Sequence, residues 1–252
     1  MSDLLLLSEA QMRRIEGHFP LSHGVPRVDD RRILSGILFV IRNGLRWRDA
    51  PTGYGPHKTI YNRFIRWSRL GVFDRIFADL AKDGDGVLMI DATHIKAHRT
   101  AASLFKKGLL PRAIGRSRGG LTSKLHVLCD GRGRPLRLLL TEGQRNDHIG
   151  ARALAPDLPE ATVLLADRAY DSHWFRQTLD DRGITACIPT HRNHKRRFPY
   201  DPVLYRRRHR IENLFARLKD WRRIHTRYDR CADIFLAAVT FACICLFWIN
   251  ES

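Results

Sequence analysis

VLMID, residues 87–91, is the point at which the character of the chain changes. Helical periodicity dominates before the Gly-containing linker at 81–86, whereas short apolar runs typical of buried strands follow it. Three strand-like runs in series, followed by alternating helical and strand-like segments, predict an α/β (α+β) fold in which helices flank a mixed sheet. The strand-like runs are 87–91, 121–130, 135–143, 161–167 and 184–190, and the helical patterns are 148–158, 172–183, 206–223 and 234–249.

Two of the strand-like runs end on an aspartate, Asp91 in VLMID and Asp167 in TVLLAD. Ligands of open α/β sheets bind at the carboxyl ends of the strands, so acids at two such ends are expected to face one cleft. A single aspartate at this position can instead cap the next helix or shape a turn. Two of them in a chain of net charge +18 favour a functional site.

The segment RRRHRIENLFARLKDWRR, residues 206–223, predicts a basic helix that carries a glutamate in its first half. At about 100° per residue, Tyr205, Arg208, Glu212 and Lys219 fall within a stripe of about 60° that adjoins the apolar face. The alternative is an exposed ladder with an Arg208–Glu212 pair at i, i+4 spacing, which stabilises a helix by only about 0.2–0.5 kcal/mol. That alternative does not explain why the polar stripe lies beside the apolar one.

Three carboxylates without a Cys/His cluster suit a hard cation. Mg²⁺ prefers oxygen ligands and keeps several waters that substrate phosphate oxygens can replace. Two such ions, roughly 3.5–4 Å apart, can activate a water or a 3′-hydroxyl and stabilise the leaving oxygen of a phosphodiester. The glutamate of the basic helix is therefore a candidate third metal ligand, with the basic residues around it holding DNA phosphates.

The net charge of +18 in 252 residues indicates a polyanionic partner, because so large a charge otherwise only adds self-repulsion. A membrane surface is the other candidate, but the charge lies in folded-looking segments, which favours nucleic acid. The apolar stretch 234–249 is shorter than the roughly 20 residues that span a bilayer, so a buried helix is favoured over a membrane segment. An odd number of cysteines without a CxxC motif predicts reduced thiols in a cytoplasmic protein rather than disulfides or a zinc site.

The first 82 residues predict a small helical module. A capping signal at Ser8 and Gln11, a helix that ends at Gly44 and a basic aromatic helix after a Pro/Gly-rich turn give the outline of a DNA-binding domain. The basic aromatic helix after the turn presents a polar face that could enter a major groove. Alternatively, the helix packs on the catalytic domain and this face is only exposed to solvent. Its candidate DNA contacts are Lys58, Asn62, Arg63 and Arg66, with Arg46 and Arg48 flanking Trp47, which either wedges into DNA or joins the core.

Other polar residues are weaker candidates. Arg116 and Arg118 lie in a Gly-rich loop and are expected to contact the DNA backbone. Lys124 and His126 alternate on a predicted strand, where they could reach DNA from the sheet edge or form an ordinary polar face. His94 follows Asp91 by three residues, but imidazole is an uncommon ligand of Mg²⁺. The acids that offer an alternative assignment are Asp147 and Asp171, and Asp171 is expected to cap a helix that starts near Ser172.

Together these features resemble the DDE transposases of bacterial insertion sequences, in particular the insertion-sequence-five-like group. The family's Y-x2-R-x3-E-x6-K signature is present as Tyr205, Arg208, Glu212 and Lys219. The resemblance covers nearly the whole chain. It includes LMIDATHIKAHR and LLADRAYDS around the two aspartates, GRSRGGLTSKLHVLCD between them, and GLRWRDAPTGYGPHKTIYNRFIRWSRLGVF in the N-terminal region.

The resemblance implies a helical DNA-binding domain over residues 1–82, followed by a ribonuclease-H-like catalytic domain over 86–250. The implied ligands of two Mg²⁺ ions, which Mn²⁺ can replace, are Asp91, Asp167 and Glu212. Tyr205 and Arg208 are then expected to contact the DNA near the cleavage point, and Lys219 a phosphate farther along. Glu212 follows Asp167 by 45 positions, which leaves no room for the large β-rich insertion that some relatives carry.

The implied activity is cleavage and strand transfer at the terminal inverted repeats of an insertion sequence. The expected partners are double-stranded DNA, both repeats and target, and a second copy of the chain that holds the other element end. No small-molecule substrate or membrane is expected, and the expected location is the bacterial cytoplasm, in association with the nucleoid. A nuclease without strand transfer and a domesticated DNA-binding protein are the alternatives, but the second would tolerate loss of the acids, and all three are present.

Overall fold

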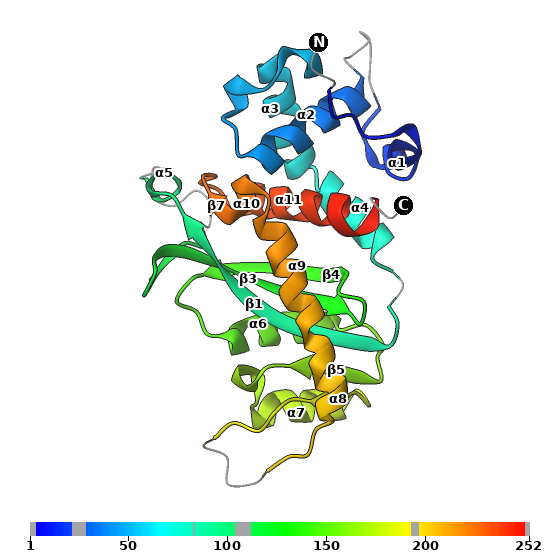
Figure 1. The fold of residues 1–252 in the computed structure, drawn as a ribbon, viewed down its shortest axis with the longest axis vertical. Helices are drawn as coiled ribbons and strands as arrows, with labels where there is room; N and C mark the ends of the chain where they lie inside the picture. Colours follow the sequence, from blue (N-terminus) through cyan, green and yellow to red (C-terminus); the bar gives the residue numbers. More distant parts are fainter. Residues whose placement is uncertain (1–3, 22–28, 83, 104–111, 193–196, 250–252) are drawn as a thin grey trace. The chain divides into compact units, whose positions relative to one another are not determined.

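The computed structural model describes residues 4–21, 29–82, 84–103, 112–192 and 197–249, and the chain forms two compact units (Figure 1). The first unit comprises residues 1–80, 98–111 and 218–252, and the second comprises 81–97 and 112–217. The first crossing between units lies at the predicted linker. By its contacts the C-terminal helix groups with the N-terminal helices. The domain bounds 1–82 and 86–250 stay a prediction.

Helices dominate the first unit. The capping box predicted at Ser8 and Gln11 is confirmed at the start of α1, and α2 ends at Gly44, whose φ of 69° suits a residue without a Cβ. The C-terminal helix α11 contacts α2, α3 and α4 within this unit. The elements are α1 (Glu9–Arg13), α2 (Asp30–Asn43), α3 (His57–Arg69), α4 (Val72–Leu80), α5 (Arg99–Ala102), α10 (Arg222–His225), β7 (Thr226–Arg227) and α11 (Ala232–Cys243).

The burial of α11 explains why it joins the first unit. Ten of its twelve residues are buried, so the helix is apolar on every side and needs neighbours all around it. The π-helical turn that follows, Ile244–Trp248, is also mostly buried. No helix in the described ranges is both long enough and apolar enough to cross a membrane, so the prediction of a buried helix is confirmed. All five cysteines are free thiols.

The second unit is built on a mixed sheet in the order β2-β3-β1-β5-β6. β4 also pairs with β3, along the stretch that follows the residues paired with β2. The pairs among β1 to β4 are antiparallel, whereas β5 runs parallel to both β1 and β6. The predicted mixed sheet with flanking helices is therefore confirmed. Its strands are β1 (Val87–Ala97), β2 (Gly115–Ser117), β3 (Gly120–Asp130), β4 (Pro135–Glu142), β5 (Val163–Ala166) and β6 (Thr185–Cys187).

Helices cover the sheet and carry polar residues to it. α6 (Asp147–Leu154) packs against β1, β3 and β4, and α7 (His173–Asp180) packs against β6. A nearly continuous helical segment formed by α8 (Pro202–Tyr205), a 3-10 turn (Arg206–Arg208) and α9 (His209–Lys219) crosses the sheet in Figure 1. The apolar face predicted for this segment is buried, at Ile211, Leu214, Phe215, Leu218 and Trp221.

Candidate active site

Strand register places Asp91 and Asp167 side by side. β1 and β5 are parallel neighbours whose last paired residues are Ile90 and Ala166, so the two aspartates are the next residues on the two strands. Neighbouring strands are about 4.8 Å apart, and residues at equivalent positions point to the same face. Burial raises the pKa of Asp91, and the charge of the nearby Asp167 raises it further.

The sequence predicted that Asp91 ends its strand, but in the structure the strand continues past it. β1 continues to Ala97 because β3 pairs with it as far as Lys96, whereas β5 stops at Ala166. Asp91 therefore lies where the parallel half of the sheet ends. Asp167 does follow its strand, and its carboxylate accepts a hydrogen bond from the Ala169 amide at 2.9 Å, at the start of the 3-10 turn Arg168–Tyr170.

Arg208 connects the first acid to the glutamate. Its Nη2 donates to Asp91 Oδ2 at 2.5 Å, and its Nη1 donates to Glu212 Oε1 at 3.1 Å. The guanidinium and the Asp91 carboxylate are largely buried, with side-chain exposures of 15% and 14%, whereas Glu212 is 59% exposed. The predicted i, i+4 pair is thus present, but the stronger contact of Arg208 is made to a strand 117 residues away.

The pKa shifts in this group show that Arg208 and the acids stabilise one another's charges. Burial raises the pKa of Asp91, and Arg208 opposes that shift. Burial lowers the pKa of Arg208, but Asp91, Tyr205 and Asp167 together raise it above the ordinary value. Tyr205 lies in the same field: burial raises the pKa of its hydroxyl, and Arg208 lowers it. Arg208 is therefore the positive charge that balances the acids in this arrangement.

The three carboxylates are suitable ligands for a hard divalent ion, but in this structure they are not close enough together to coordinate one. Asp91, Asp167 and Glu212 offer only carboxylate oxygens, which Mg²⁺ and Mn²⁺ prefer. In the described part of the chain, no three acidic, histidine or cysteine side chains are close enough to hold a metal together. Asp91 already accepts hydrogen bonds from Arg208 and from the Ala92 amide. A bound ion would therefore take over a position that the guanidinium shares.

Lys219 is the last residue of α9 and is half-buried, and burial lowers the pKa of its ammonium group. His94 does not face a metal site, because its Nε2 lies 2.9 Å from the carbonyl oxygen of Gly143. The two acids that offered an alternative assignment, Asp147 and Asp171, each form an ion pair with a basic side chain. Asp147 pairs with Lys124 at 2.9 Å, and Asp171 pairs with Arg176 at 2.6 Å.

The cap predicted for Asp171 is wrong. Ser172 caps α7 instead, since its Oγ accepts a hydrogen bond from the Phe175 amide at 3.2 Å. The Asp171 side chain is fully buried, where it accepts hydrogen bonds from Arg176 and from the His191 amide. Its carboxylate therefore joins α7 to the segment after β6 and is not available to a ligand.

Lys124 and His126 are buried, so they do not lie at the open sheet edge from which they were predicted to reach DNA. β3 is an inner strand, bordered by β1 on one side and by β2 and β4 on the other, so it offers no sheet edge. His126 is fully buried, with Nε2 2.9 Å from Thr141 Oγ1, and Lys124 is paired with Asp147. Burial lowers the pKa of His126 to about 4, so the ring is neutral at physiological pH.

The basic face of α3 is partly as predicted. Lys58, Asn62 and Arg66 are exposed, so they are accessible to DNA. Arg63 is not: it forms an ion pair with Asp30 and its guanidinium lies 5.8 Å from the Trp67 ring centroid. Arg63 is therefore less accessible than the other three residues, because a second helix supplies a carboxylate for its guanidinium.

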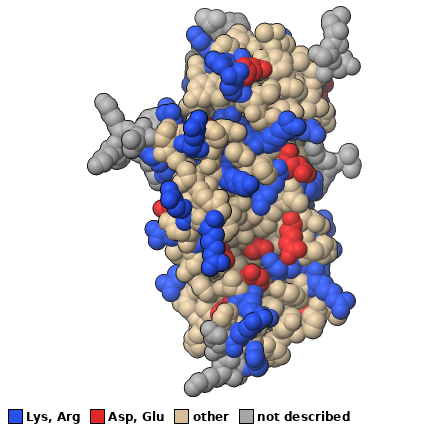
Figure 2. Space-filling model, turned by 60° about the vertical axis from the view of Figure 1, so that its left-hand side comes forward, with Lys and Arg blue, Asp and Glu red and all other residues tan. Residues whose placement is uncertain are grey.

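Trp47 is half-buried and packs against the aromatic residues of its unit. Its ring stacks on Phe64 with the centroids 5.0 Å apart, which favours packing over a wedge into DNA. Arg46 and Arg48 on either side of it are exposed, and Arg46 pairs with Asp49 at 2.6 Å. Arg116 and Arg118 are exposed around the β2–β3 turn. Figure 2 shows Lys and Arg side chains spread over one face of the molecule, with a smaller group of acidic residues among them.

Two family models match successive parts of the chain. Residues 82–248 match the "Transposase DDE domain", and residues 7–77 match "Putative transposase of IS4/5 family". The chain is a DDE transposase of the IS4/5 family. The resemblance inferred from the sequence is therefore confirmed, and so is its assignment to a family of nucleases and transesterases.

Individual relatives support this assignment. The chain is 33% identical over 131 residues to a protein of Brucella ovis named "Putative transposase for insertion sequence element IS6501", covering 52% of this chain and all of the relative. It is 33% identical over 149 residues to a protein of Burkholderia cepacia named "Putative transposase for insertion sequence element IS402", covering 55% of this chain and 67% of the relative. Among solved structures, the piggyBac transposase synaptic complex with hairpin DNA has a TM-score of 0.52 over 94% of this chain and 69% of that chain. At 10% identity, that likeness shows the fold alone.

Proposed function

We propose that this transposase binds the terminal inverted repeats of its own insertion sequence and catalyses metal-dependent cleavage and strand transfer. The observation that carries the proposal is the register that sets Asp91 beside Asp167, with Arg208 joining Asp91 to Glu212. Three carboxylates and one guanidinium in a chain of net charge +18 suit a phosphodiester substrate.

The roles of the residues follow from their positions. Asp91, Asp167 and Glu212 would hold two divalent ions, Mg²⁺ or Mn²⁺. Such ions, when bound, activate an attacking oxygen and stabilise the leaving oxygen of a phosphodiester. Arg208 and Tyr205 would contact the phosphate being attacked, because both groups share the field of the acids. Lys219 would hold a phosphate farther along the strand.

DNA positioning would come from residues outside the acidic centre. Lys58, Asn62 and Arg66 on α3, and Arg46, Arg48, Arg116 and Arg118 elsewhere, are exposed and polar. Phosphate contacts by the four arginines outside α3 would fix the register of the duplex without reading its sequence, whereas the α3 face would read the repeat from the major groove. Because both ends of an element must be held for joining, we expect a homodimer on DNA.

The deciding experiment uses the purified protein, Mg²⁺ or Mn²⁺, and a labelled duplex that ends in the inverted repeat of its own element. Cleavage at the repeat boundary that is lost in Glu212→Gln supports the proposal, and joining of the 3′-hydroxyl ends to target DNA supports strand transfer. Cleavage without joining would favour a nuclease. Tight binding with no cleavage in either metal would favour a domesticated DNA-binding protein.

A further inference from the structure

The start of α9 is attached to the turn between β3 and β4, residues 130–134, here called the β3–β4 turn. Nη1 of Arg210 donates a hydrogen bond to the carbonyl oxygen of Gly131, 79 residues away in the sequence. Arg210 lies between Arg208 and Glu212 along the chain, and the sequence did not single it out as a site residue. Helix residues two positions apart point about 200° from each other, so Arg210 holds α9 from the side nearly opposite Glu212.

Internal hydrogen bonds make the β3–β4 turn a rigid support. The buried Asp130 carboxylate accepts hydrogen bonds from the amides of Arg132 and Arg134, at 3.0 and 2.8 Å. The Arg132 amide belongs to the same peptide group as the Gly131 carbonyl, so this bond also fixes the acceptor that faces the helix. Asp85, which precedes β1, accepts a hydrogen bond from the Gly131 amide at 2.8 Å. The turn therefore presents a fixed carbonyl to α9.

Gly133 allows the turn and the helix to approach closely. Its φ of 83° lies in the left-handed region that suits a residue without a Cβ. A Cβ at this position would lie 3.1 Å from both the Cβ and the carbonyl oxygen of Arg210, which is tighter than most contacts of this kind. A side chain at position 133 would therefore push the turn and α9 apart.

The attachment through Arg210 differs from the one through Arg208. Arg208 donates to Asp91 and Glu212, so a divalent ion at these carboxylates would compete with its hydrogen bonds. Arg210 donates to a backbone carbonyl that belongs to none of the candidate ligands. Its hold on α9 is therefore independent of metal, and it remains when Arg208 gives up its acceptors.

The reach of Glu212 depends on where the helix backbone is held. The three acids are not close enough to hold an ion together in this structure, so the Glu212 side chain has to turn toward Asp91. Glu212 is 59% exposed, which leaves room for that movement. The distance left to cover is then set by the position of the α9 backbone.

We propose that Arg210 and the β3–β4 turn position the backbone of α9 so that Glu212 can reach a divalent ion held by Asp91. Arg210 is thus a positioning residue, which acts through Glu212 and contacts neither the metal nor the DNA. The inference rests on the proposed function for the role of Glu212 as a ligand. Residues that orient metal ligands in this way typically change metal affinity by about 10–100-fold when they are replaced.

The test measures Mn²⁺ binding to the purified full chain without DNA, by calorimetry. Arg210→Ala should weaken Mn²⁺ binding by roughly tenfold. Loss of a positive charge near the acids would by itself strengthen the binding of a cation, so the sign of the change separates positioning from charge. Arg210→Lys keeps a donor and the charge, and should restore part of the affinity.

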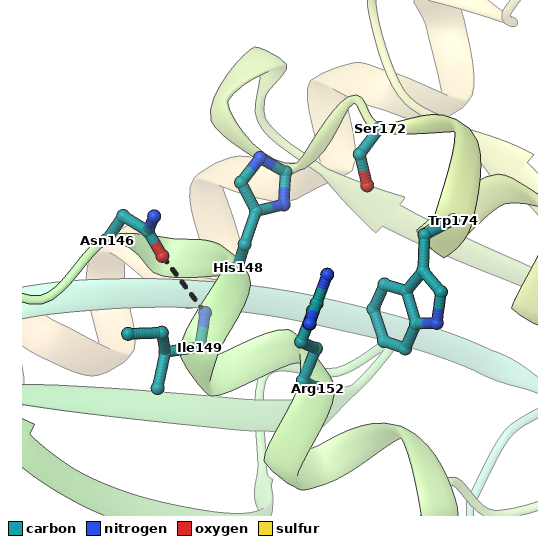
Figure 3. A pocket seen from close by; sticks show the side chains of 6 residues that line it. All are labelled: Asn146, His148, Ile149, Arg152, Ser172 and Trp174. Atoms are coloured by element: carbon teal, nitrogen blue, oxygen red, sulfur yellow. Dashed lines mark hydrogen bonds between the residues drawn. The ribbon is translucent and has the colours of Figure 1, made fainter.

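Two charge controls accompany these variants. Arg132→Ala removes an exposed arginine from the same turn. Arg152→Ala removes an arginine that lines a pocket of about 350 Å³ at the starts of α6 and α7, to which no residue of α9 contributes (Figure 3). Neither change should weaken Mn²⁺ binding, because neither side chain holds α9.

Gly133→Ala disturbs the same contact without a change of charge. It should weaken Mn²⁺ binding about as much as Arg210→Ala. Gly183→Ala is the matched control, because Gly183 has a φ of 68° but an added Cβ there would meet no atom within 4 Å. It imposes a similar backbone strain, seen as a lower melting temperature, and should leave the Mn²⁺ affinity unchanged.

A double-mutant cycle decides whether Arg210 acts through Glu212. In a Glu212→Gln background, Arg210→Ala should change Mn²⁺ affinity by less than about twofold. A full loss in that background, or unchanged affinity in both Arg210→Ala and Gly133→Ala, would overturn the inference. Equal Mn²⁺ binding by the wild-type protein and Glu212→Gln would reject the proposed role of Glu212 itself, whereas Glu212-dependent binding that ignores Arg210 rejects the positioning role alone.

Discussion

Arg208 donates to Asp91 across 117 residues of sequence and holds Glu212 with its other terminal nitrogen, so one guanidinium joins the first and third acids of the transposase. This contact connects the segment at the end of α8 to the middle of β1. It also places a positive charge where a divalent ion would compete for the same carboxylate. Metal binding at Asp91 is therefore expected to weaken the hydrogen bonds of Arg208 to Asp91 and Glu212.

Removal of any one carboxylate should abolish chemistry while leaving DNA binding intact. We expect Asp91→Asn, Asp167→Asn and Glu212→Gln each to lower metal-dependent cleavage of an inverted-repeat duplex by roughly 10³-fold or more. Duplex affinity should stay equal or improve, because a carboxylate that repels phosphate is lost. Asp157→Asn removes an exposed acid on the same unit and serves as the control. Cleavage at the normal rate in Glu212→Gln would rule out its role as a ligand.

Arg208→Ala should strengthen metal binding in the absence of DNA. The guanidinium that competes for Asp91 Oδ2 is gone, so we expect Mn²⁺ to bind roughly tenfold more tightly, about 1.4 kcal/mol, as measured by calorimetry. Arg206→Ala, which removes an equal charge from the same turn, should leave the affinity nearly unchanged. Equal or weaker Mn²⁺ binding in Arg208→Ala would show that the guanidinium does not share the metal position.

The sequence predicted the strands, the three acids and the polar stripe because these depend on local periodicity and spacing. Lys124 and His126 could not be placed, since alternation along β3 does not say whether other strands cover both of its edges. The ion pairs of Arg208 with Asp91 and of Arg63 with Asp30 were missed for the same reason, as each joins elements far apart in the chain. The grouping of α11 with the N-terminal helices likewise depends on long-range packing.

The two arginines on α3 should behave differently. Arg66→Ala removes an exposed side chain, so we expect weaker duplex binding and a salt dependence reduced by about one unit of slope, with unchanged stability. Arg63→Ala removes the partly buried ion pair with Asp30 and should lower the free energy of unfolding by about 2 kcal/mol. Salt-dependent anisotropy and thermal melting separate the two effects. Equal losses of stability in both variants would contradict the assignment.

Acid should destabilise the second unit through His126. Burial lowers its pKa to about 4, so between pH 6.5 and 4 the unfolded chain binds a proton that the folded chain does not, and stability falls as the pH falls through this window. The neighbouring charges are Asp147, which opposes the shift, and Lys124 and His94, which reinforce it. The loss reaches roughly 3 kcal/mol at about 1.36 kcal/mol per unit. Denaturant titrations at several pH values should show a shallower slope in His126→Gln, and an equal slope would exclude this cause.

Gly150 should be intolerant of a side chain because of the same histidine. A Cβ at position 150 would lie 2.1 Å from His126 Nδ1, closer than any van der Waals contact. We expect Gly150→Ala to lower the free energy of unfolding by about 2–3 kcal/mol through overpacking, although alanine favours a helix. The double variant Gly150→Ala/His126→Ala should be more stable than the sum of the single changes predicts, because the clash has been removed. Additive losses in denaturant unfolding would show that α6 does not pack on His126, whereas a positive coupling would establish the packing of α6 on β3.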